Sequence, residues 1–186
     1  INKQLFNKNF ELKINRNGLF LSFEGGEGAG KSSQIKLLSN LLDDFKLPFI
    51  TTREPGGTVV GEEIRKILVS GKVNKMDSFS EFLCFSASRR EHISKVILPA
   101  LESGKIVICD RYIDSSIVYQ GLVGGVNLDM IRSIHKNFCY NLYPDLTILL
   151  NIEPKIGLKR KKNSVLLEDR FENFDFKFHE MIQNKF

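Results

Sequence analysis

The sequence predicts an α/β fold, a three-layer sandwich in which helices cover both faces of a central parallel sheet of about five strands. Short apolar runs alternate with longer amphipathic stretches, as in proteins whose buried parallel strands are joined by helices. The 186 residues are 42% hydrophobic and 26% charged, which suits one substantial core better than two. We therefore expect one domain, residues 18–186, after a polar N-terminal tail, residues 1–17.

The elements follow from the apolar pattern. Strands are expected at Leu19–Phe23, Phe49–Thr52, Ile106–Cys109 and Leu146–Ile152, where each apolar run is continuous. Helices are expected at Lys31–Phe45, Gly61–Leu68, Phe79–Glu102 and Leu128–Cys139. A last helix is expected near the C-terminus, from the helical spacing of Phe171, Phe174, Phe178, Met181 and Ile182.

Three local signals refine these boundaries. Ser78 followed by Glu81 predicts a capping box for the third helix. Pro99 should kink or end that helix, because proline lacks the backbone N–H that a helix interior needs. The glycines of Gly121–Gly125 predict a flexible loop.

Charge and cysteine content narrow the class of protein. A net charge of +5 suits a polyanionic partner such as a nucleotide, but it is too small to indicate nucleic-acid binding. The cysteines (Cys84, Cys109 and Cys139) are widely spaced, without a metal-binding pattern, and are expected to be reduced, as in the cytoplasm. No apolar run approaches the length of a membrane-spanning helix, so no membrane association is expected.

The strongest motif is a glycine-rich phosphate-binding loop. The run Gly25-Gly26-Glu27-Gly28-Ala29-Gly30-Lys31-Ser32 matches G-x-x-x-x-G-K-[ST] and stands between an expected strand and an expected helix. Glycines let successive N–H groups converge on phosphate oxygens, and a helix N-terminus adds positive potential. Lys31 can then contact the β- and γ-phosphates, and the Ser32 hydroxyl can bind Mg²⁺.

Asp110 is the second anchor. It follows the third expected strand, and ligands of open α/β sheets bind at the carboxyl ends of the strands. Its carboxylate can hold Mg²⁺ directly or through water, and Arg111 beside it can clamp a phosphate with two hydrogen bonds. Taken alone, Asp110 could instead belong to a surface salt bridge.

Further motifs resemble those of bacterial thymidylate kinases. After the phosphate loop, preceded by Phe23-Glu24, come Thr52-Arg53-Glu54-Pro55-Gly56-Gly57, Ser86-Ala87-Ser88-Arg89-Arg90, Asp110-Arg111-Tyr112 and Tyr119-Gln120-Gly121. Tyr143–Thr147 and Gly157–Arg160 also fit. Their order and spacing agree from Gly18 to about Glu180, which makes the likeness far more specific than the phosphate loop alone.

The resemblance implies transfer of the ATP γ-phosphate to dTMP, giving dTDP, with Mg²⁺ held by Ser32 and Asp110, in a homodimer. The implied ATP-binding residues are Gly25, Gly26, Glu27, Gly28, Ala29, Gly30, Lys31, Ser32 and Ser33. The implied dTMP-binding residues are Arg53, Arg65, Phe85, Arg89, Arg111, Ser116, Tyr119 and Gln120. Phe85 would stack on the pyrimidine, and Arg89 and Gln120 would hydrogen-bond the thymine edge. Taken alone, Phe85 could be a core residue and Arg89 a solvated helix charge.

The implied catalytic residues are Lys31, Arg111, Arg160 and Glu27. In this family a further arginine comes from the phosphate loop or from a lid, and Glu27 at the loop position matches the subgroup with a lid arginine. The lid is expected at about residues 157–170, with Arg160 as first choice and Arg170 as second. Relatives continue with a further strand and helix that help to hold adenine, and this region is expected to be missing here.

Alternative functions remain open at this stage. Another P-loop kinase for a deoxynucleoside or a different nucleotide shares most of these features. Asn74-Lys75-Met76-Asp77 matches the N-K-x-D of GTPase switches, but only one expected strand separates it from the phosphate loop, and no D-x-x-G lies between. Lys159–Lys162 resembles a nucleic-acid patch, but it is one short run without aromatic residues.

Overall fold

A four-stranded parallel sheet forms the centre of the computed structural model, which describes residues 17–73, 75–161, 170–171 and 173–186. The strand order is β2-β3-β1-β4, with strands β1 (Phe20–Glu24), β2 (Phe49–Arg53), β3 (Ile106–Asp110) and β4 (Leu146–Leu149). The predicted α/β class and parallel sheet are confirmed. The predicted number of about five strands is not reached in this part of the chain, because each of the four apolar runs supplies one strand and no other run does so.

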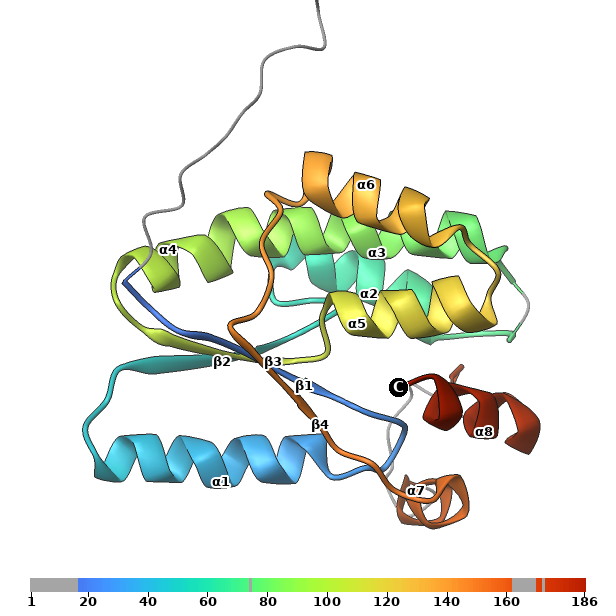
Figure 1. Ribbon diagram of the computed structural model, residues 1–186, viewed down its shortest axis with the longest axis horizontal. Helices are drawn as coiled ribbons and strands as arrows, with labels where there is room; N and C mark the ends of the chain where they lie inside the picture. Colours follow the sequence, from blue (N-terminus) through green and yellow to red (C-terminus); the bar gives the residue numbers. More distant parts are fainter. Residues whose placement is uncertain (1–16, 74, 162–169, 172) are drawn as a thin grey trace, which may run out of the picture.

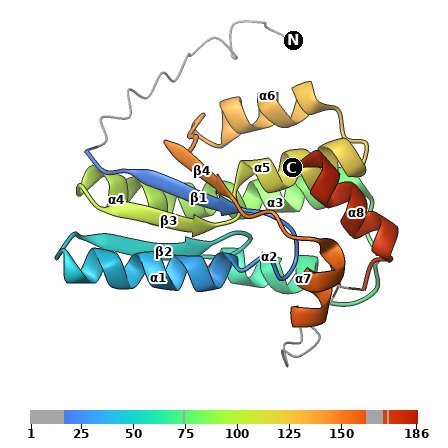
Figure 2. The same cartoon turned by 60° about the horizontal axis from the view of Figure 1, so that its bottom comes forward.

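Helices cover both faces of this sheet, as Figures 1 and 2 show. On one face lies α1 (Lys31–Asp44), and on the other lie the helices from α2 to α6. The bounds of the latter are α2 (Val59–Val69), α3 (Ser78–His92), α4 (Leu98–Glu102), α5 (Ile113–Ser116) and α6 (Leu128–Phe138). Beyond the carboxyl ends of the strands lie α7 (Pro154–Lys161) and α8 (Phe176–Lys185).

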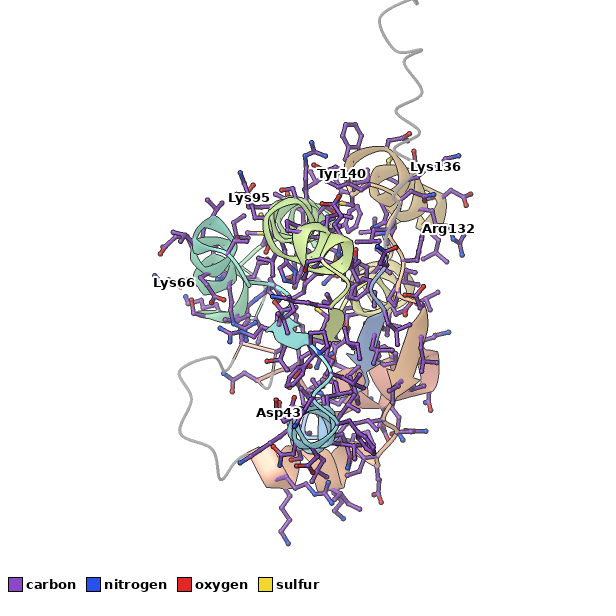
Figure 3. The ribbon with its side chains drawn as sticks, turned by 90° about the vertical axis from the view of Figure 1, so that its left-hand side faces the viewer. Asp43, Lys66, Lys95, Arg132, Lys136 and Tyr140 are labelled. Carbon is purple, nitrogen blue, oxygen red and sulfur yellow. The ribbon has the colours of Figure 1, made fainter. Side chains whose placement is uncertain are left out.

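Side-chain alternation along the strands divides the core in two. Phe20 and Val107 point to the face of α3 and α4, whereas Leu21, Phe23 and Ile108 point to α1. Both faces are covered, so β1 is buried along its whole length, including the polar Ser22 and Glu24. Figure 3 shows charged side chains such as Lys66 and Arg132 at the outside of the helical layer.

The long helix before β3 differs from its prediction in two ways. The π-helical segment η2 (Ile93–Ile97) joins α3 to α4, and Pro99 lies in the first turn of α4, where its missing N–H is tolerated. The helix therefore continues past Pro99 to Glu102. Its N-cap is Asp77, whose carboxylate accepts from the backbone N–H of Phe79 at 3.0 Å. The predicted Ser78 cap is therefore wrong.

The glycine-rich run at Gly121–Gly125 is also more ordered than predicted. A second π-helical segment, η3 (Ile117–Val123), continues α5 and includes Gly121. A β-carbon on Gly121 would lie 2.6 Å from the Cδ2 of Leu128, so α6 packs closely on this glycine, and a larger residue would require the Leu128 side chain to shift. Of this run, only Gly124 and Gly125 form a turn after η3. Gly125 has a positive φ angle of 78°.

The expected last helix begins at Phe176, with Asp175 as its N-cap, so Phe171 and Phe174 precede it. Phe178 still stacks on Phe174, with ring centroids 4.0 Å apart.

The three cysteines are free thiols. Among the described helices, none has both the length and the apolar character required to cross a membrane. Residues 1–16 of the expected tail and 162–169 of the expected lid lie outside the described residues.

Candidate active site

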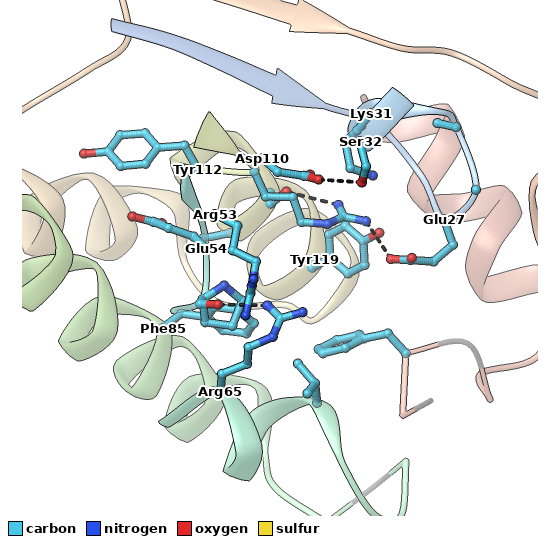
Figure 4. Close-up of a pocket in the computed structure, with 18 of the residues that line it drawn as sticks. Glu27, Lys31, Ser32, Arg53, Glu54, Arg65, Phe85, Asp110, Tyr112 and Tyr119 are labelled. Atoms are coloured by element: carbon cyan, nitrogen blue, oxygen red, sulfur yellow. Dashed lines mark hydrogen bonds and ion pairs between the residues drawn. The ribbon is translucent and has the colours of Figure 1, made fainter. Parts of the chain in front are cut away.

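A cavity of about 810 Å³ opens at the carboxyl ends of the strands and gathers most of the predicted site residues (Figure 4). It is lined by Glu27, Gly28, Ala29, Gly30, Lys31, Ser32, Ser33, Arg53, Arg65, Phe85, Arg89, Asp110, Arg111, Ser116, Tyr119, Gln120 and Arg160. Among the predicted site residues only Gly25 and Gly26 do not line it, although their carbonyls contact Lys31. Residues that range from Glu27 to Arg160 in the sequence therefore meet in one volume.

The glycine-rich loop has the backbone conformation that its sequence predicts. Gly25, Gly28 and Gly30 have positive φ angles of 131°, 67° and 96°, and α1 begins at Lys31. The ammonium of Lys31 donates to the carbonyls of Gly25 and Gly26 at 3.0 Å each. The N–H groups that open α1 are thus directed at the cavity beside a buried cation, an arrangement suited to phosphate.

The loop is packed directly against α7. A β-carbon on Gly28 would collide with the carbonyl of Gly157, and one on Gly157 would collide with the carbonyl of Glu27. This backbone contact places α7, and with it Arg160, at the rim of the phosphate loop. Arg160 lines the cavity and is exposed.

Ser32 and Asp110 meet in the lining of the cavity. The Ser32 hydroxyl donates to the Oδ2 of Asp110 at 3.2 Å. A hydroxyl and a carboxylate are oxygen ligands of the kind Mg²⁺ prefers. The described residues hold no group of three acidic, histidine or cysteine side chains that could bind a metal. This pair fits a cation that takes its remaining ligands from phosphate and water, as Mg²⁺ does.

Arg111 is held beside the phosphate loop by Glu27. Its Nη2 donates to the Oε1 of Glu27 at 2.6 Å and its Nη1 to the carbonyl of Gly25 at 3.0 Å, while its guanidinium lies 5.3 Å from the ring centroid of Tyr119. Burial alone would lower the pKa of Arg111, but Tyr119 and the nearby carboxylates outweigh it and raise that pKa above its usual value. Arg111 is therefore a permanent positive charge in the cavity.

Arg89 is fully buried and is held by Glu54. Its Nε donates to the Oε2 of Glu54 at 2.7 Å, and its Nη2 donates to the hydroxyl of Ser116 at 2.9 Å. The other oxygen of Glu54 hydrogen-bonds His92, whose Nε2 contacts the Thr52 hydroxyl at 2.6 Å. Burial alone would raise the pKa of Glu54, but Arg89 and His92 hold it below its usual value. The base-reading arginine of the sequence prediction thus belongs to a buried ionic network.

Two further arginines approach the cavity from β2 and α2. Arg53 forms an ion pair with Glu62 at 3.0 Å, and Arg65 donates to the carbonyl of Pro55 at 2.8 Å. Figure 4 shows both side chains on the same side of the cavity. With Arg111 they give this part of the cavity three guanidinium groups.

One wall of the cavity carries aromatic rings and a side-chain amide, from Phe85, Tyr119, Gln120 and Phe171. Phe85 faces Phe171, with ring centroids 6.4 Å apart, and Tyr119 contacts Phe171 edge-on at 5.8 Å. The Nε2 of Gln120 donates to Glu81 at 2.7 Å. A flat apolar surface beside an amide suits a planar heterocycle with polar edges.

Arg170, the second choice for the lid arginine, lies elsewhere. It is buried outside the cavity, where it forms an ion pair with Glu81 at 2.5 Å and donates to the carbonyls of Leu68 and Val73. With its guanidinium engaged in this way, Arg170 is a structural residue in this state. Asp77, the last residue of the GTPase-like motif, caps α3, whereas Asn74, the first residue of that motif, lies outside the described residues.

Sequence analysis missed several buried acids around the cavity. Glu24 is buried at the end of β1 and accepts from the N–H of Tyr112 at 2.7 Å and the hydroxyl of Ser115 at 2.6 Å. Burial raises the pKa of Glu24 to about 7, although Ser115 and Arg111 oppose the shift. Glu54 and Glu81 were missed as well. Glu24 and Glu54 stand within the quoted motifs, Glu24 as the last residue of β1 and Glu54 directly after β2, but neither was assigned a role in the site.

A parallel sheet whose first strand leads through a glycine-rich loop into a helix, with a lysine, a serine and a strand-end aspartate in one cavity, defines a P-loop nucleotide-binding protein. The thymidylate kinase family matches residues 23–186. A thymidylate kinase of Symbiobacterium thermophilum is 42% identical over 165 residues, which are 89% of this chain and 76% of that protein. A crystal structure of thymidylate kinase from Ehrlichia chaffeensis superposes with a TM-score of 0.72 at 34% identity, covering 90% of this chain and 83% of that one.

The chain belongs to the thymidylate kinase family. This membership makes it a nucleoside monophosphate kinase that phosphorylates dTMP, and it confirms the resemblance drawn from the motifs. The GTPase-type alternative is set aside.

The state of Lys31 gives a testable pH dependence. Burial, and next the positive charge of Arg111, lower the pKa of Lys31 from 10.5 to about 8. As pH rises through that value the ammonium loses its proton and its attraction for phosphate, so kcat/KM for ATP should be steady near pH 7 and fall above about pH 8. In the Lys31→Arg variant the residual activity should lack this fall, since arginine stays charged. A wild-type profile that is flat to pH 9.5 would contradict the assignment.

Proposed function

We propose that the cavity binds ATP at the phosphate loop and dTMP opposite it, and that the γ-phosphate passes directly between them to give dTDP and ADP. The observation that supports this is the placement of the Lys31-bearing loop and of Arg53, Arg65 and Arg111 around a single cavity. A volume of about 810 Å³ is within the range of small-molecule sites. ATP and dTMP both carry negatively charged phosphates that repel each other, so they can bind side by side only where positive side chains surround both.

On the donor side, the N–H groups of residues 25–33 and the start of α1 bind the ATP phosphates. Lys31 leaves the carbonyls of Gly25 and Gly26 and moves to the β- and γ-phosphates. Ser32 and Asp110 hold Mg²⁺, directly or through water. When bound, Mg²⁺ supplies charge neutralisation on the phosphate oxygens.

On the acceptor side, Arg53, Arg65 and Arg111 bind the dTMP phosphate. Phe85 stacks on the thymine ring, an interaction worth roughly 1–3 kcal/mol per base. Arg89 and Gln120 hydrogen-bond the thymine edge, and Ser116 and Tyr119 line the pocket for the sugar and base. Because Arg89 is already fixed by Glu54, this pocket needs little rearrangement to receive the base.

Chemistry in this cavity is positioning plus electrostatics. An oxygen of the dTMP phosphate forms a bond to the γ-phosphorus while the bond from that phosphorus to the β-phosphate oxygen breaks, in line, without a covalent enzyme intermediate. Glu27 keeps Arg111 beside the transferring group through their 2.6 Å ion pair. Lys31, Arg111 and Arg160 stabilise the charge on the phosphoryl oxygens.

The choice of acceptor is tested by a coupled assay of ATP with dTMP, dUMP, dCMP and dGMP. We expect dTMP to have the highest kcat/KM, and dCMP and dGMP to be poorer by several orders of magnitude, since their edges leave the groups of the pocket unpaired. Preference for another nucleoside monophosphate, or for a nucleoside, would instead support another P-loop kinase activity.

The role of Arg160 is tested by the Arg160→Ala variant. If this guanidinium stabilises the transferring phosphoryl group, kcat should fall by about 10²-fold or more while the KM for dTMP changes little. Lys159→Ala is the matched control, because Lys159 is an exposed cation on the same helix outside the cavity lining, and it should retain kcat. A normal kcat for Arg160→Ala would remove Arg160 from the mechanism.

We infer that the enzyme is a homodimer joined through the helical layer of α2, α3 and α6. This layer exposes large apolar residues to solvent, among them Val60, Ile67 and Phe138, whose exposed fractions are 53%, 54% and 58%. Apolar patches of this kind mark interfaces. Sedimentation equilibrium of the native chain should give twice the 21.3 kDa of one chain. Ile67→Glu should shift the mass toward the monomer, and Leu37→Glu on α1 should not. A monomeric native chain would refute the proposal.

We infer the cytoplasm as the compartment, since its reducing conditions suit three free thiols, two of them buried.

A further inference from the structure

Glu81 on α3 joins two residues that are far apart in the sequence. Its Oε1 accepts from the Nε2 of Gln120 on η3 at 2.7 Å, and its Oε2 pairs with the Nη2 of Arg170 at 2.5 Å. All three residues are at least nine-tenths buried. Gln120 lines the cavity, whereas Glu81 and Arg170 stand behind it. Glu81 therefore reaches the cavity lining through Gln120, which it contacts directly, and through Arg170, whose guanidinium lies 5.0 Å from the ring centroid of the cavity residue Phe171.

The hydrogen bond from Gln120 settles which way its side-chain amide faces. An ion pair with a guanidinium requires an ionised carboxylate, and an ionised carboxylate can only accept hydrogen bonds. The Nε2 group of Gln120, which donates, must therefore face Glu81. Because the oxygen and nitrogen occupy different branches of the planar amide, fixing Nε2 on Glu81 places the carbonyl Oε1 on the side away from Glu81, where it can accept a hydrogen bond from a base in the cavity that Gln120 lines.

We propose that Glu81 is a positioning residue for nucleobase selection: it holds Gln120 with its carbonyl oxygen toward the base, so that a pyrimidine carrying hydrogen on N3 is accepted and one with a bare N3 lone pair is rejected. This inference rests on the proposed function, in which Gln120 contacts the base. Thymine and uracil carry that hydrogen, and neutral cytosine does not. With cytosine, two acceptors would face each other in a buried pocket, at the cost of an unpaired polar group.

Arg170 has a separate part in this arrangement. Its Nη1 and Nε donate to the carbonyls of Leu68 at 2.8 Å and Val73 at 3.1 Å, which ties the guanidinium to the end of α2 and the loop after it. From this fixed position it holds the second oxygen of Glu81. One oxygen of the Glu81 carboxylate thus pairs with Arg170 and stabilises the fold, and the other orients Gln120. Variants can separate the effect on stability from the effect on base selection.

The test compares dTMP with dCMP as acceptors for Glu81→Gln. A glutamine at position 81 can either accept from or donate to Gln120, so both orientations of the Gln120 amide become available. We expect the ratio of kcat/KM for dTMP to that for dCMP to fall at least about tenfold. The loss should lie in the KM for dTMP, with kcat and the KM for ATP nearly unchanged. Glu102→Gln, an exposed acid at the end of α4, is the matched control and should keep the native ratio.

Loss of Glu81 also leaves Arg170 buried without its carboxylate partner, which can destabilise the fold. The double variant Glu81→Gln/Arg170→Met removes that charge and restores a stable comparison, monitored by Tm. It should show the same loss of base discrimination as Glu81→Gln. Arg170→Met alone keeps the carboxylate at Gln120 and should retain most of the discrimination even where its Tm falls. Equal loss in Arg170→Met and Glu81→Gln would overturn the proposal.

Gln120→Ala separates this inference from the function on which it rests. If Gln120→Ala keeps the native preference for dTMP over dCMP, then Gln120 does not contact the base, and that part of the proposed function fails. If Gln120→Ala loses the preference while Glu81→Gln and the double variant both keep it, then the orienting role of Glu81 is refuted and the proposed function stands.

Discussion

The register of the parallel strands is the constraint on which the cavity depends. β3 aligns Asp110 with Phe23 of β1 on one side and with Arg53 of β2 on the other. Two backbone bonds extend the alignment beyond the strands, from Arg111 to the carbonyl of Phe23 and from Glu54 to the carbonyl of Asp110, at 2.9 Å and 3.0 Å. A shift of one residue would turn every strand-end side chain to the opposite face of the sheet. The metal-binding and phosphate-binding groups therefore meet because three strands end together.

Around this edge, the guanidinium groups of Arg89 and Arg111 are each held by a carboxylate. Glu54 fixes Arg89 and Glu27 fixes Arg111. A buried charge without a partner would be costly, so these pairs allow cations to remain in a largely enclosed cavity. The same pairs orient the donors in advance, which reduces the reorganisation needed when phosphate charge moves during transfer.

The fold and the donor half of the site could be predicted from the sequence because their signals are local. The phosphate loop is one contiguous motif, and Asp110 directly follows an apolar run. Glu54 and Glu81 escaped prediction because their partners are remote, with Arg89 35 residues from Glu54. The two π-helical segments had no local signal either, since the ordered conformation at Gly121 is tied to the approach of α6. The family resemblance supplied Arg89 and Gln120 as site residues, but not the acids that orient them.

The contact between Gly28 and Gly157 has an evolutionary and engineering consequence. Each glycine leaves room for the backbone of the other segment, so a methyl group at either position would push α7 outward and carry Arg160 with it. A side chain at position 28 cannot be accommodated by a smaller residue at position 157, because position 157 is already glycine, and the same holds in reverse. The two positions therefore form one backbone contact, and libraries meant to alter nucleotide preference should leave both glycines untouched while varying the opposite wall.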